Sequence, residues 1–367
     1  MSEVLKAPMP YFGGKADIAE KVWERFGNVP GYIEPFYGTG AVLLARPLPF
    51  DGVETINDKC GLIANFWRAV QSAPEEVAKW ADRPVFENDL HAIHAWLVSE
   101  MGSLAPKLEG DRNWFDAEIA GLWCWGICCW IGSGWCSGDG PWQVQEVDGV
   151  RQLVHLSNTG RGVNRQLVHL SNTGMGINRK LVHLSDAGMG VNRKLVHLSD
   201  AGRGETASES ISATPEWAVY EWMQALSDRL KRVRVCCGDW RRVCGGNSGD
   251  SLKHFFAGGN KCAIFLDPPY SAEANRNETL YREEDLTVAH DVREWAIKQG
   301  DDPRLRIALC GYSREHAMPA NWSILEWKTR GGYASAADGE TNGKANCRRE
   351  VIHFSPHCLK PIQDNLL

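Results

Sequence analysis

The sequence lacks an uninterrupted apolar run long enough to cross a bilayer, which requires about 20 residues. Its most apolar stretch, residues 122–135, is shorter than that and is broken by glycines. The first residues contain no apolar segment of the kind that marks a secretory signal peptide. From these absences we expect a cytoplasmic protein with no membrane segment, and we expect a monomer.

Cysteine pairs at the spacing of a structural metal site are also missing from the most cysteine-rich stretch. The chain has 12 cysteines. Four of them cluster without forming a Cys-x-x-Cys pair, namely Cys124, Cys128, Cys129 and Cys136. Zinc sites commonly use that pair, and cytoplasmic thiols stay reduced. We therefore expect buried free thiols here and no metal, with zinc as the alternative.

An overall excess of positive charge is absent as well, although nucleic-acid-binding proteins commonly carry one. The formal net charge is -6. Residues 151–204, however, contain eight Arg or Lys and two Asp, a formal charge of +6, which leaves −12 for the rest of the chain. Positive charge is thus concentrated in one central segment, as a local phosphate-binding surface requires.

The same central segment is an internal repeat. The unit RQLVHLSNTGRGVN begins at Arg151, and related units begin at Arg165, Arg179 and Arg193, a period of 14 residues. Each unit combines a short extended stretch with an Asn/Asp-x-Gly-x-Gly turn, so we expect β-rich units that pair with their neighbours.

Two interpretations of the repeats are equally open. They form a basic arm whose arginines contact DNA phosphates, or they form a spacer whose copy number changes by duplication. A third interpretation, a metal-binding ladder, is weaker because no cysteine or paired carboxylate accompanies the recurring histidines. Those histidines are His155, His169, His183 and His197.

Strand and helix patterns alternate on both sides of the central segment, which predicts an α/β fold with an interrupted sheet. The ligands of such a sheet bind at the carboxyl ends of its strands. We predict strands at residues 31–35, 54–57, 231–237, 263–266, 306–311 and 351–354. We predict helices at residues 41–46, 61–73, 74–81, 89–98 and 214–232.

The first motif with chemical meaning is Glu-Pro-Phe-Tyr-Gly-Thr-Gly, residues 34–40, where a strand leads into a glycine-rich turn and a helix. Glycines allow the backbone to approach a ligand closely. A dinucleotide fingerprint needs a third glycine where the chain has Leu43, which disfavours NAD. Asp58 follows Gly38 by twenty residues, and its type and spacing suit a ribose contact. A nucleoside cofactor without a pyrophosphate fits this pattern.

The second motif is Asp267-Pro268-Pro269-Tyr270, which follows an apolar strand. Proline lacks an N–H group, so the adjacent backbone offers only carbonyl oxygens. Asp267 and such a carbonyl can accept the two hydrogens of an amino group, and the ring of Tyr270 can stack on a base that has left the helix. Catalysis of methyl transfer to the amine then rests on positioning and electrostatics.

These motifs, together with Tyr-Phe-Gly-Gly-Lys at residues 11–15 and Cys-Gly-Asp-Trp at residues 237–240, resemble the D12 class of DNA adenine-N6 methyltransferases, the Dam-like enzymes with the alpha motif order. The resemblance covers about half of the chain. It implies a Rossmann-like core that binds S-adenosylmethionine and double-stranded DNA. It also implies a catalytic role for Asp267, Pro268, Pro269 and Tyr270. The implied cofactor contacts are Tyr11, Lys15, Glu34, Phe36, Gly38, Gly40, Asp58, Asp239 and Trp240.

The resemblance further divides the chain into a first part of the methyltransferase core (residues 1–65), an inserted target-recognition region (66–233) and a second part of the core (234–367). We could not match residues 66–233 to the helices and hairpin with which the family usually reads DNA. The expected DNA contacts are Arg151, Arg165, Arg179, Arg193, Arg276 and Arg330. The function implied is site-specific adenine methylation by base flipping, as in restriction-modification systems.

Three alternatives remain. Cytosine-N4 methylation uses the same chemistry, but those enzymes more often have Ser at the first position of the catalytic motif. Methyltransferases that act on RNA or on a protein glutamine more usually have Asn at that position. A catalytically silent DNA-binding protein on the same fold is the alternative outside enzymology, and donor binding without methyl transfer would indicate it.

Overall fold

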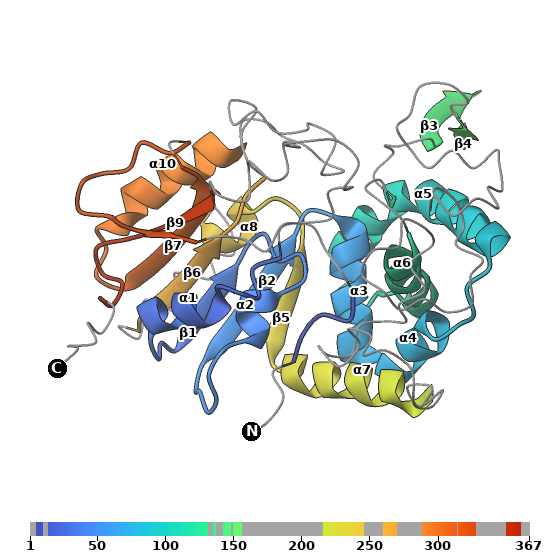
Figure 1. The fold of residues 1–367 in the computed structure, drawn as a ribbon, viewed down its shortest axis with the longest axis horizontal. Coiled ribbons are helices and arrows are strands. Elements are labelled where there is room, and N and C mark those ends of the chain that lie inside the picture. Colours follow the sequence, from blue (N-terminus) through green and yellow to red (C-terminus); the bar gives the residue numbers. More distant parts are fainter. Residues whose placement is uncertain are drawn as a thin grey trace, which may run out of the picture.

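Seven strands form one sheet in the order β5-β2-β1-β6-β7-β9-β8 in the computed structural model of this chain (Figure 1). They are β1 (Gly31–Glu34), β2 (Val53–Asp58), β5 (Val233–Cys237), β6 (Cys262–Leu266), β7 (Leu305–Tyr312), β8 (Ser323–Glu326) and β9 (Glu350–Phe354). The structure describes residues 5–9, 14–130, 135–136, 142–147, 150–155, 216–245, 260–269, 288–313, 315–327 and 350–360.

Most of the sheet is parallel. Strands β5, β2, β1, β6 and β7 all pair in parallel, whereas β9 runs antiparallel to both β7 and β8. Every residue of β1, β6 and β7 is buried. Apolar sequences such as Cys-Ala-Ile-Phe-Leu in β6 form such strands because helices cover both faces of a parallel sheet. The predicted α/β class is therefore confirmed.

Helices cover both faces of the sheet. One face packs against α1 (Ala19–Phe26) and α2 (Ala41–Leu44), and the buried side chains there include Trp23, Tyr32 and Phe265. The other face packs against α8 (Arg241–Cys244) and α10 (Val288–Gly300), where Val243 and Val292 meet residues of β6 and β7. The result is a layered core around the predicted strands.

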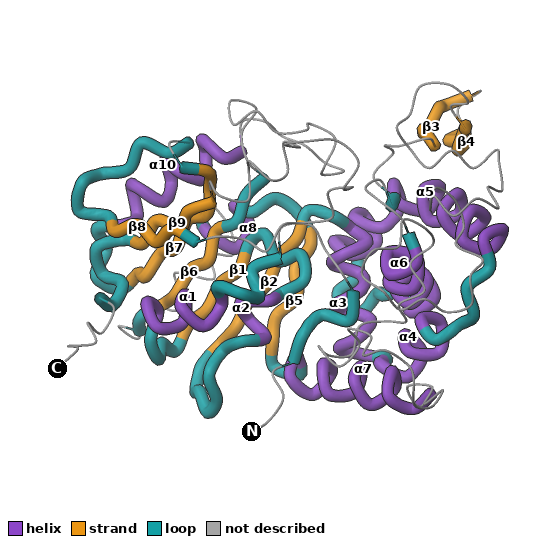
Figure 2. The backbone as a smooth tube through the Cα atoms, in the orientation of Figure 1, coloured by secondary structure: helices purple, strands orange, loops and turns teal. Residues whose placement is uncertain are grey.

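The remaining helices form a bundle beside the β5 edge of the sheet (Figures 1 and 2). They are α3 (Gly61–Ser72), α4 (Pro74–Ala81), α5 (Glu87–Gly110), α6 (Ala117–Cys129) and α7 (Glu216–Leu230). Helix α6 packs on α3 and α4, and its start is fixed by Asp116, whose side chain accepts a hydrogen bond from the backbone N–H of Ile119 at 2.9 Å. A side chain of this type at the N-cap satisfies an otherwise unpaired N–H group.

A two-stranded hairpin extends from the bundle. Strand β3 (Trp142–Val147) pairs antiparallel with β4 (Val150–His155), and β4 contacts α5. The start of the first 14-residue unit, from Arg151 to His155, is extended as predicted. Its partner, however, is the segment that precedes the repeats rather than another repeat unit. The remaining units lie outside the described residues.

The four clustered cysteines are buried, as expected, and they lie on α6 and the segment that follows it. Burial raises the pKa of the Cys129 thiol, which keeps it in the neutral thiol form. Among the helices that the structure describes, none combines the length and the apolar character of a membrane span.

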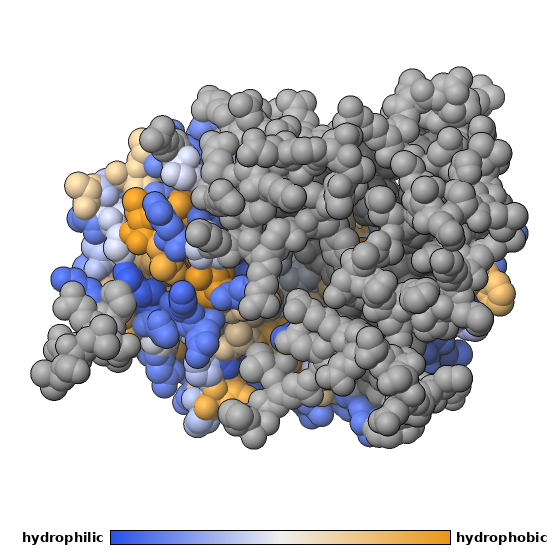
Figure 3. Space-filling view, viewed as in Figure 1, coloured by the Kyte–Doolittle hydropathy of each residue, from blue (hydrophilic) through white to orange (hydrophobic). Residues whose placement is uncertain are grey.

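On the face shown in Figure 3, hydrophilic and hydrophobic residues are intermixed over the described part of the surface. The large hydrophobic side chains exposed in the described part of the chain are Leu48, Val53, Phe86, Ile324 and Leu359.

Candidate active site

The order of the strands places a topological switch point at the carboxyl ends of β1 and β6. Along the chain, β1 is followed by β2 and β5 on one side of the sheet, and β6 and β7 then add on the other side. Connections that diverge in this way leave an opening between the two central strands, where α/β proteins bind their ligands. Residues 35–40 follow β1 and residues 267–269 follow β6, so both predicted motifs border this opening.

The glycine-rich turn after β1 has the backbone geometry that requires glycine. Gly38 and Gly40 have φ angles of 49° and 66°, in the left-handed region. A Cβ atom on Gly40 would lie 2.2 Å from the ring of Tyr37. The turn is closed by a hydrogen bond from the Gly40 N–H to the Tyr37 carbonyl at 2.7 Å, and Trp67 Nε1 donates to the Gly38 carbonyl at 2.8 Å.

Asp58 lies directly beside this turn, as the twenty-residue spacing predicts. Its carboxylate accepts hydrogen bonds from the backbone N–H of Gly38 at 3.0 Å and of Cys60 at 2.8 Å. The acidic side chain at the end of β2 therefore fixes the position of the glycine turn at the end of β1. Gly38 and Asp58 are therefore in direct contact at the ends of neighbouring strands.

Asn57 joins three loops at the same edge of the sheet. Its side-chain Nδ2 donates to the carbonyls of Pro35 at 3.0 Å and of Gly238 at 2.9 Å, and the side chain is buried. The Gly238 N–H in turn donates to the Asp58 carbonyl at 3.0 Å. The loops after β1, β2 and β5 are thereby held together, which brings Asp239 to the same side of the sheet as the glycine turn.

The next two predicted cofactor contacts differ in exposure. Asp239 is half exposed, and its carboxylate accepts a hydrogen bond from the backbone N–H of Arg241 at 2.9 Å. Trp240 is 4% exposed and packs edge-on against Trp295, with ring centroids 5.9 Å apart. In this structure Trp240 is a core residue beneath the loop, whereas the resemblance implies a ring that flanks the cofactor.

The second motif carries a buried ion pair. The Lys15 Nζ atom lies 2.9 Å from Oδ2 of Asp267, and Lys15 is only 5% exposed. Lys15 comes from the segment before α1 and Asp267 from the end of β6, so the two motifs meet although about 250 residues separate them. Pro268 is buried and Pro269 is partly exposed beside Asp267.

Two further groups at this site were missed from the sequence. Oε2 of Glu350 lies 3.9 Å from Lys15 Nζ. Burial raises the pKa of the Cys310 thiol well above its usual value, and the charge of the nearby Asp267 adds to that effect. Burial raises the pKa of Glu350, an effect that the Lys15 ammonium opposes. The antiparallel pairing of β9 with β7 places Glu350 opposite Tyr312, at the carboxyl end of β7. A strand candidate starting at residue 351 was recognised, but its direction was not.

Glu34 is the last residue of β1, and Phe36 follows two residues later. The Glu34 side chain is 3% exposed, and Oε2 accepts a hydrogen bond from the Tyr32 hydroxyl at 2.7 Å. Burial raises the pKa of Glu34 well above its usual value, and the nearby Asp267 carboxylate adds to that effect. Phe36 is partly buried against the core on the α8 and α10 side.

The structure thus brings ten of the predicted residues to one edge of the sheet. They are Lys15, Glu34, Phe36, Gly38, Gly40, Asp58, Asp239, Asp267, Pro268 and Pro269. Seven predicted residues lie outside the described part of the chain, namely Tyr11, Arg165, Arg179, Arg193, Tyr270, Arg276 and Arg330. Arg151 is described only by its backbone, as the second residue of β4.

Comparison with protein-family models finds no match to this chain, and comparison with curated proteins finds none either.

Proposed function

We propose that this protein is an S-adenosylmethionine-dependent DNA methyltransferase that methylates the N6 amino group of adenine in double-stranded DNA. One observation supports this above the others. The glycine turn with Asp58, and Asp267 with its two prolines, border the same opening of the sheet. A donor site and an amine-binding site must be adjacent for direct methyl transfer, because the nitrogen and the methyl carbon have to meet in line.

The residues around the first motif fit a nucleoside donor. The two left-handed glycines let the backbone approach a ligand without Cβ atoms, and Asp58 supplies an acceptor for ribose hydroxyls at the end of β2. Leu43 is buried where a dinucleotide site would have glycine, so the turn does not have the form that suits a pyrophosphate. When bound, S-adenosylmethionine supplies an electrophilic methyl group on a sulfonium.

Asp267 positions the other reactant. Its carboxylate and a carbonyl of the Pro-Pro segment accept the two amino hydrogens, which directs the nitrogen lone pair towards the donor. The amine forms the new N–C bond as the S–C bond breaks, and the nitrogen then releases one proton to water. Lys15 holds the Asp267 carboxylate at 2.9 Å and thereby fixes its orientation. Tyr270 stacks on the flipped base in this proposal.

The region between Asp58 and Asp239 supports the choice of DNA. The resemblance implies helices and a hairpin for target recognition in this interval. The chain has α3 to α7 there, together with the hairpin of β3 and β4, which carries Arg151 (Figure 1). The hairpin projects from α5 beyond the core, and a two-stranded ribbon of this kind fits the major groove of DNA.

Methyl transfer from labelled S-adenosylmethionine to unmethylated duplex DNA, followed by nucleoside analysis, tests the proposal. We expect label in N6-methyladenosine. Asp267→Ala and the closer mimic Asp267→Asn should lower the rate by about 100- to 1000-fold, the usual loss when one electrostatic contact to the reacting group is removed. Asp51→Ala, in the exposed loop before β2, is the matched control and should retain full activity.

Label in N4-methylcytosine would keep the mechanism and change the base. Donor binding with no label in DNA would contradict the proposal and favour a binding protein on this fold. Full activity in both Asp267 variants would show that another group orients the amine.

A further inference from the structure

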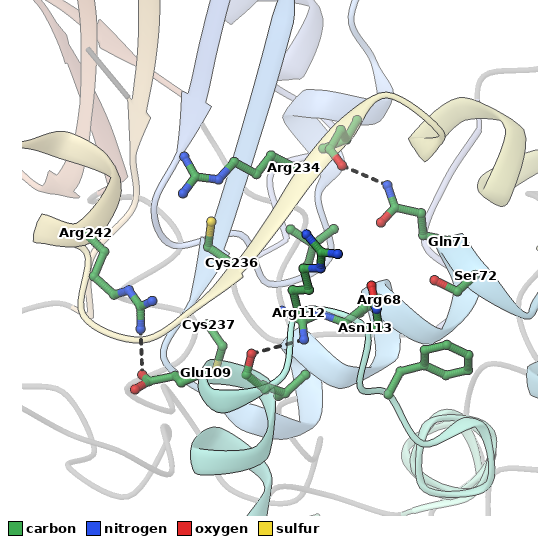
Figure 4. Close-up of a pocket in the computed structure, with 14 residues that line it drawn as sticks. Arg68, Gln71, Ser72, Glu109, Arg112, Asn113, Arg234, Cys236, Cys237 and Arg242 are labelled. Carbon is green, nitrogen blue, oxygen red and sulfur yellow. Dashed lines mark hydrogen bonds and ion pairs between the residues drawn. The ribbon is translucent and has the colours of Figure 1, made fainter. Parts of the chain in front are cut away.

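A cavity of about 590 Å³ runs along the outer edge of β5, between the sheet and the helices α3 and α5 (Figure 4). The strands β2 and β1 lie between it and β6. Four arginines line it, and each comes from a different segment. They are Arg68 of α3, Arg112 of the loop after α5, Arg234 of β5 and Arg242 of α8.

The lining is strongly positive. Glu109 is the only carboxylate among the described residues around this cavity, which leaves a formal excess of three positive charges. Glu109 is paired with Arg242, with Oε1 and Nη1 2.8 Å apart, and both side chains are about half exposed. A surface pair of this kind stabilises the fold only slightly, so it can open to admit a ligand at low cost.

Arg68 has a structural role in the cavity wall. Its Nη1 donates to the carbonyls of Leu108, Asp111 and Trp114, each at 3.1 Å. These bonds fix the loop that carries Arg112 against α3. Arg68, which is partly buried, therefore fixes the position of Arg112 beside the cavity.

The positive charges of three of these arginines act on the same side chain, the thiol of Cys236. Burial raises the pKa of the Cys236 thiol, while the positive charges of Arg234, Arg242 and Arg68 each oppose that rise. Arg234 and Cys236 alternate with valines along β5, so their side chains project on the same side of the strand. An anion near Cys236 would feel all three charges at once.

The edge of β5 is less suited to an added peptide strand. The Gln71 side chain donates to the Val233 carbonyl at 2.8 Å and to the Leu230 carbonyl at 2.6 Å, which occupies the start of the strand. An extended peptide would need those backbone groups. The arginines, in contrast, present guanidinium donors, which bind planar or tetrahedral oxyanions in pairs.

We propose that this cavity binds a phosphate group, whose oxygens are contacted by arginines of the lining. The phosphate is either a phosphodiester of a nucleic acid or a free phosphate compound. Geometry permits the first source, because β5 lies three strands from β6 and adjacent strands are about 4.8 Å apart, which places the cavity roughly 14 Å across the sheet from Asp267. The proposal does not depend on methyl transfer.

Binding of two probes to the full-length protein tests this site. One probe is inorganic pyrophosphate, followed by calorimetry, and the other is a fluorescent duplex DNA, followed by anisotropy over a range of salt concentrations. The test variant is Arg112→Gln with Arg234→Gln, which leaves the Arg68 anchor intact. Arg304→Gln is the control, because Arg304 lies in an exposed loop and pairs with Asp302.

For a nucleic-acid phosphate, we expect the double variant to bind the duplex about tenfold more weakly. The plot of log affinity against log salt should become shallower by about 1, the share of one phosphate contact. The charge-retaining pair Arg112→Lys with Arg234→Lys should keep most of that slope. Weaker pyrophosphate binding with unchanged duplex binding would assign the cavity to a free phosphate compound.

Wild-type affinity of the double variant for both probes would overturn the proposal, and so would a wild-type protein that binds neither. Methylation assayed on the same variants separates the two questions. A protein that binds phosphate here but transfers no methyl group would keep this site and remove the proposed activity. A protein that transfers methyl groups but binds no phosphate here would keep the proposed activity and remove only this site.

Discussion

The ammonium group of Lys15 lies between two carboxylates, 2.9 Å from Oδ2 of Asp267 and 3.9 Å from Oε2 of Glu350. Both carboxylates are largely shielded from water, with side chains that are 20% and 13% exposed. Like charges in such an environment repel unless a counter-charge lies close by. Lys15 thus offsets the repulsion between the two carboxylates and holds the Asp267 side chain in place.

Lys15→Met should therefore lower methyl transfer about 100-fold, because Asp267 loses the contact that orients it. It should also reduce the free energy of unfolding by about 3 kcal/mol, the usual effect of leaving buried charges without their partner. Transfer rates and urea denaturation measure the two effects. Lys15→Arg should retain most of the methyl-transfer rate and most of the free energy of unfolding. Lys21→Met, at an exposed position of α1, should change neither quantity. Equal activity of Lys15→Met and the wild type would remove Lys15 from the mechanism.

His353 is a buried titratable residue away from this site. It is 4% exposed on β9, and neither ring nitrogen forms a hydrogen bond within the described part of the chain. Burial, and then the neighbouring His316, lowers the pKa of His353 to about 4 from the usual 6.5. The unfolded chain therefore binds a proton between these pH values that the folded chain does not, and stability falls as the pH drops from 6.5 to 4.

We predict that His353→Leu removes this loss of stability at low pH. Between pH 7 and pH 4, the free energy of unfolding of the wild type should fall by about 3 kcal/mol more than that of the variant. Urea denaturation at a series of pH values measures the difference. His357→Leu is the control, because this ring is more exposed and bonds to the Asp301 carbonyl. A constant difference between wild type and His353→Leu at all pH values would contradict the argument.

Several residues of the site could be predicted, and others could not, for a physical reason. Asp58 ends β2 and Asp267 follows the apolar strand β6, so local patterns place both at the carboxyl edge of the sheet. Glu350 reaches the same edge only because β9 runs against its neighbours, which depends on pairing with distant strands. Cys310 lies within β7 and comes near Asp267 through the parallel pairing of β7 with β6, in which Leu309 stands opposite Leu266.

Among the helices and strands, too, the features set by local sequence could be predicted, and those set by packing could not. The parallel strands and α3, α4 and α7 were predicted close to their observed bounds. The segment that forms α6 was not assigned, because a helix that is buried all round has no apolar face to reveal its period. Helix α5 was predicted only to residue 98, yet it continues through Pro106 to Gly110, where buried Leu104 and Leu108 hold it against the bundle.

One ion network joins α7 to the sheet. Glu54 of β2 is 3% exposed and bonds to two arginines, with Nη1 of Arg46 at 3.0 Å and Nη1 of Arg229 at 2.7 Å. Arg229 also donates to the Leu43 carbonyl at 2.9 Å. This network ties the last helix of the bundle to the amino end of β2.

Glu54→Gln should lower the free energy of unfolding by about 3 to 5 kcal/mol, because it leaves two mostly buried guanidinium groups without their carboxylate. The same substitution at Glu76 should cost less than about 1 kcal/mol, because its pair with Lys79 is more than 60% exposed on both sides. Chemical denaturation of the two variants compares them directly. Equal losses would show that the Glu54 network does not stabilise the fold.

At the scale of the whole molecule, a single hydrophobic cluster crosses the three predicted regions. It contains Phe26 of α1, Trp123 of α6, Leu226 of α7 and Phe354 of β9. A shared core of this kind couples the bundle to the sheet, whereas separate domains have separate cores.

We therefore predict one cooperative unfolding transition for the chain, although its length would permit two. Scanning calorimetry should show a single peak, and Glu54→Gln should move that peak to lower temperature without splitting it. Two resolved peaks, only one of which responds to Glu54→Gln, would mean that the helical bundle unfolds by itself.

The pairing at the centre of the sheet also determines how long β1 lacks its second neighbouring strand while the chain is synthesised. Gly31 of β1 pairs with Cys262 of β6, and at ~5–20 residues per second a ribosome needs roughly 10 to 50 s to make the intervening chain. During that time β1 has only β2 beside it, β5 adds to the far side of β2, and the other edge of β1 has no strand to pair with. An unpaired apolar edge invites association between nascent chains. The interval before β6 emerges is thus the period in which this protein most needs a chaperone.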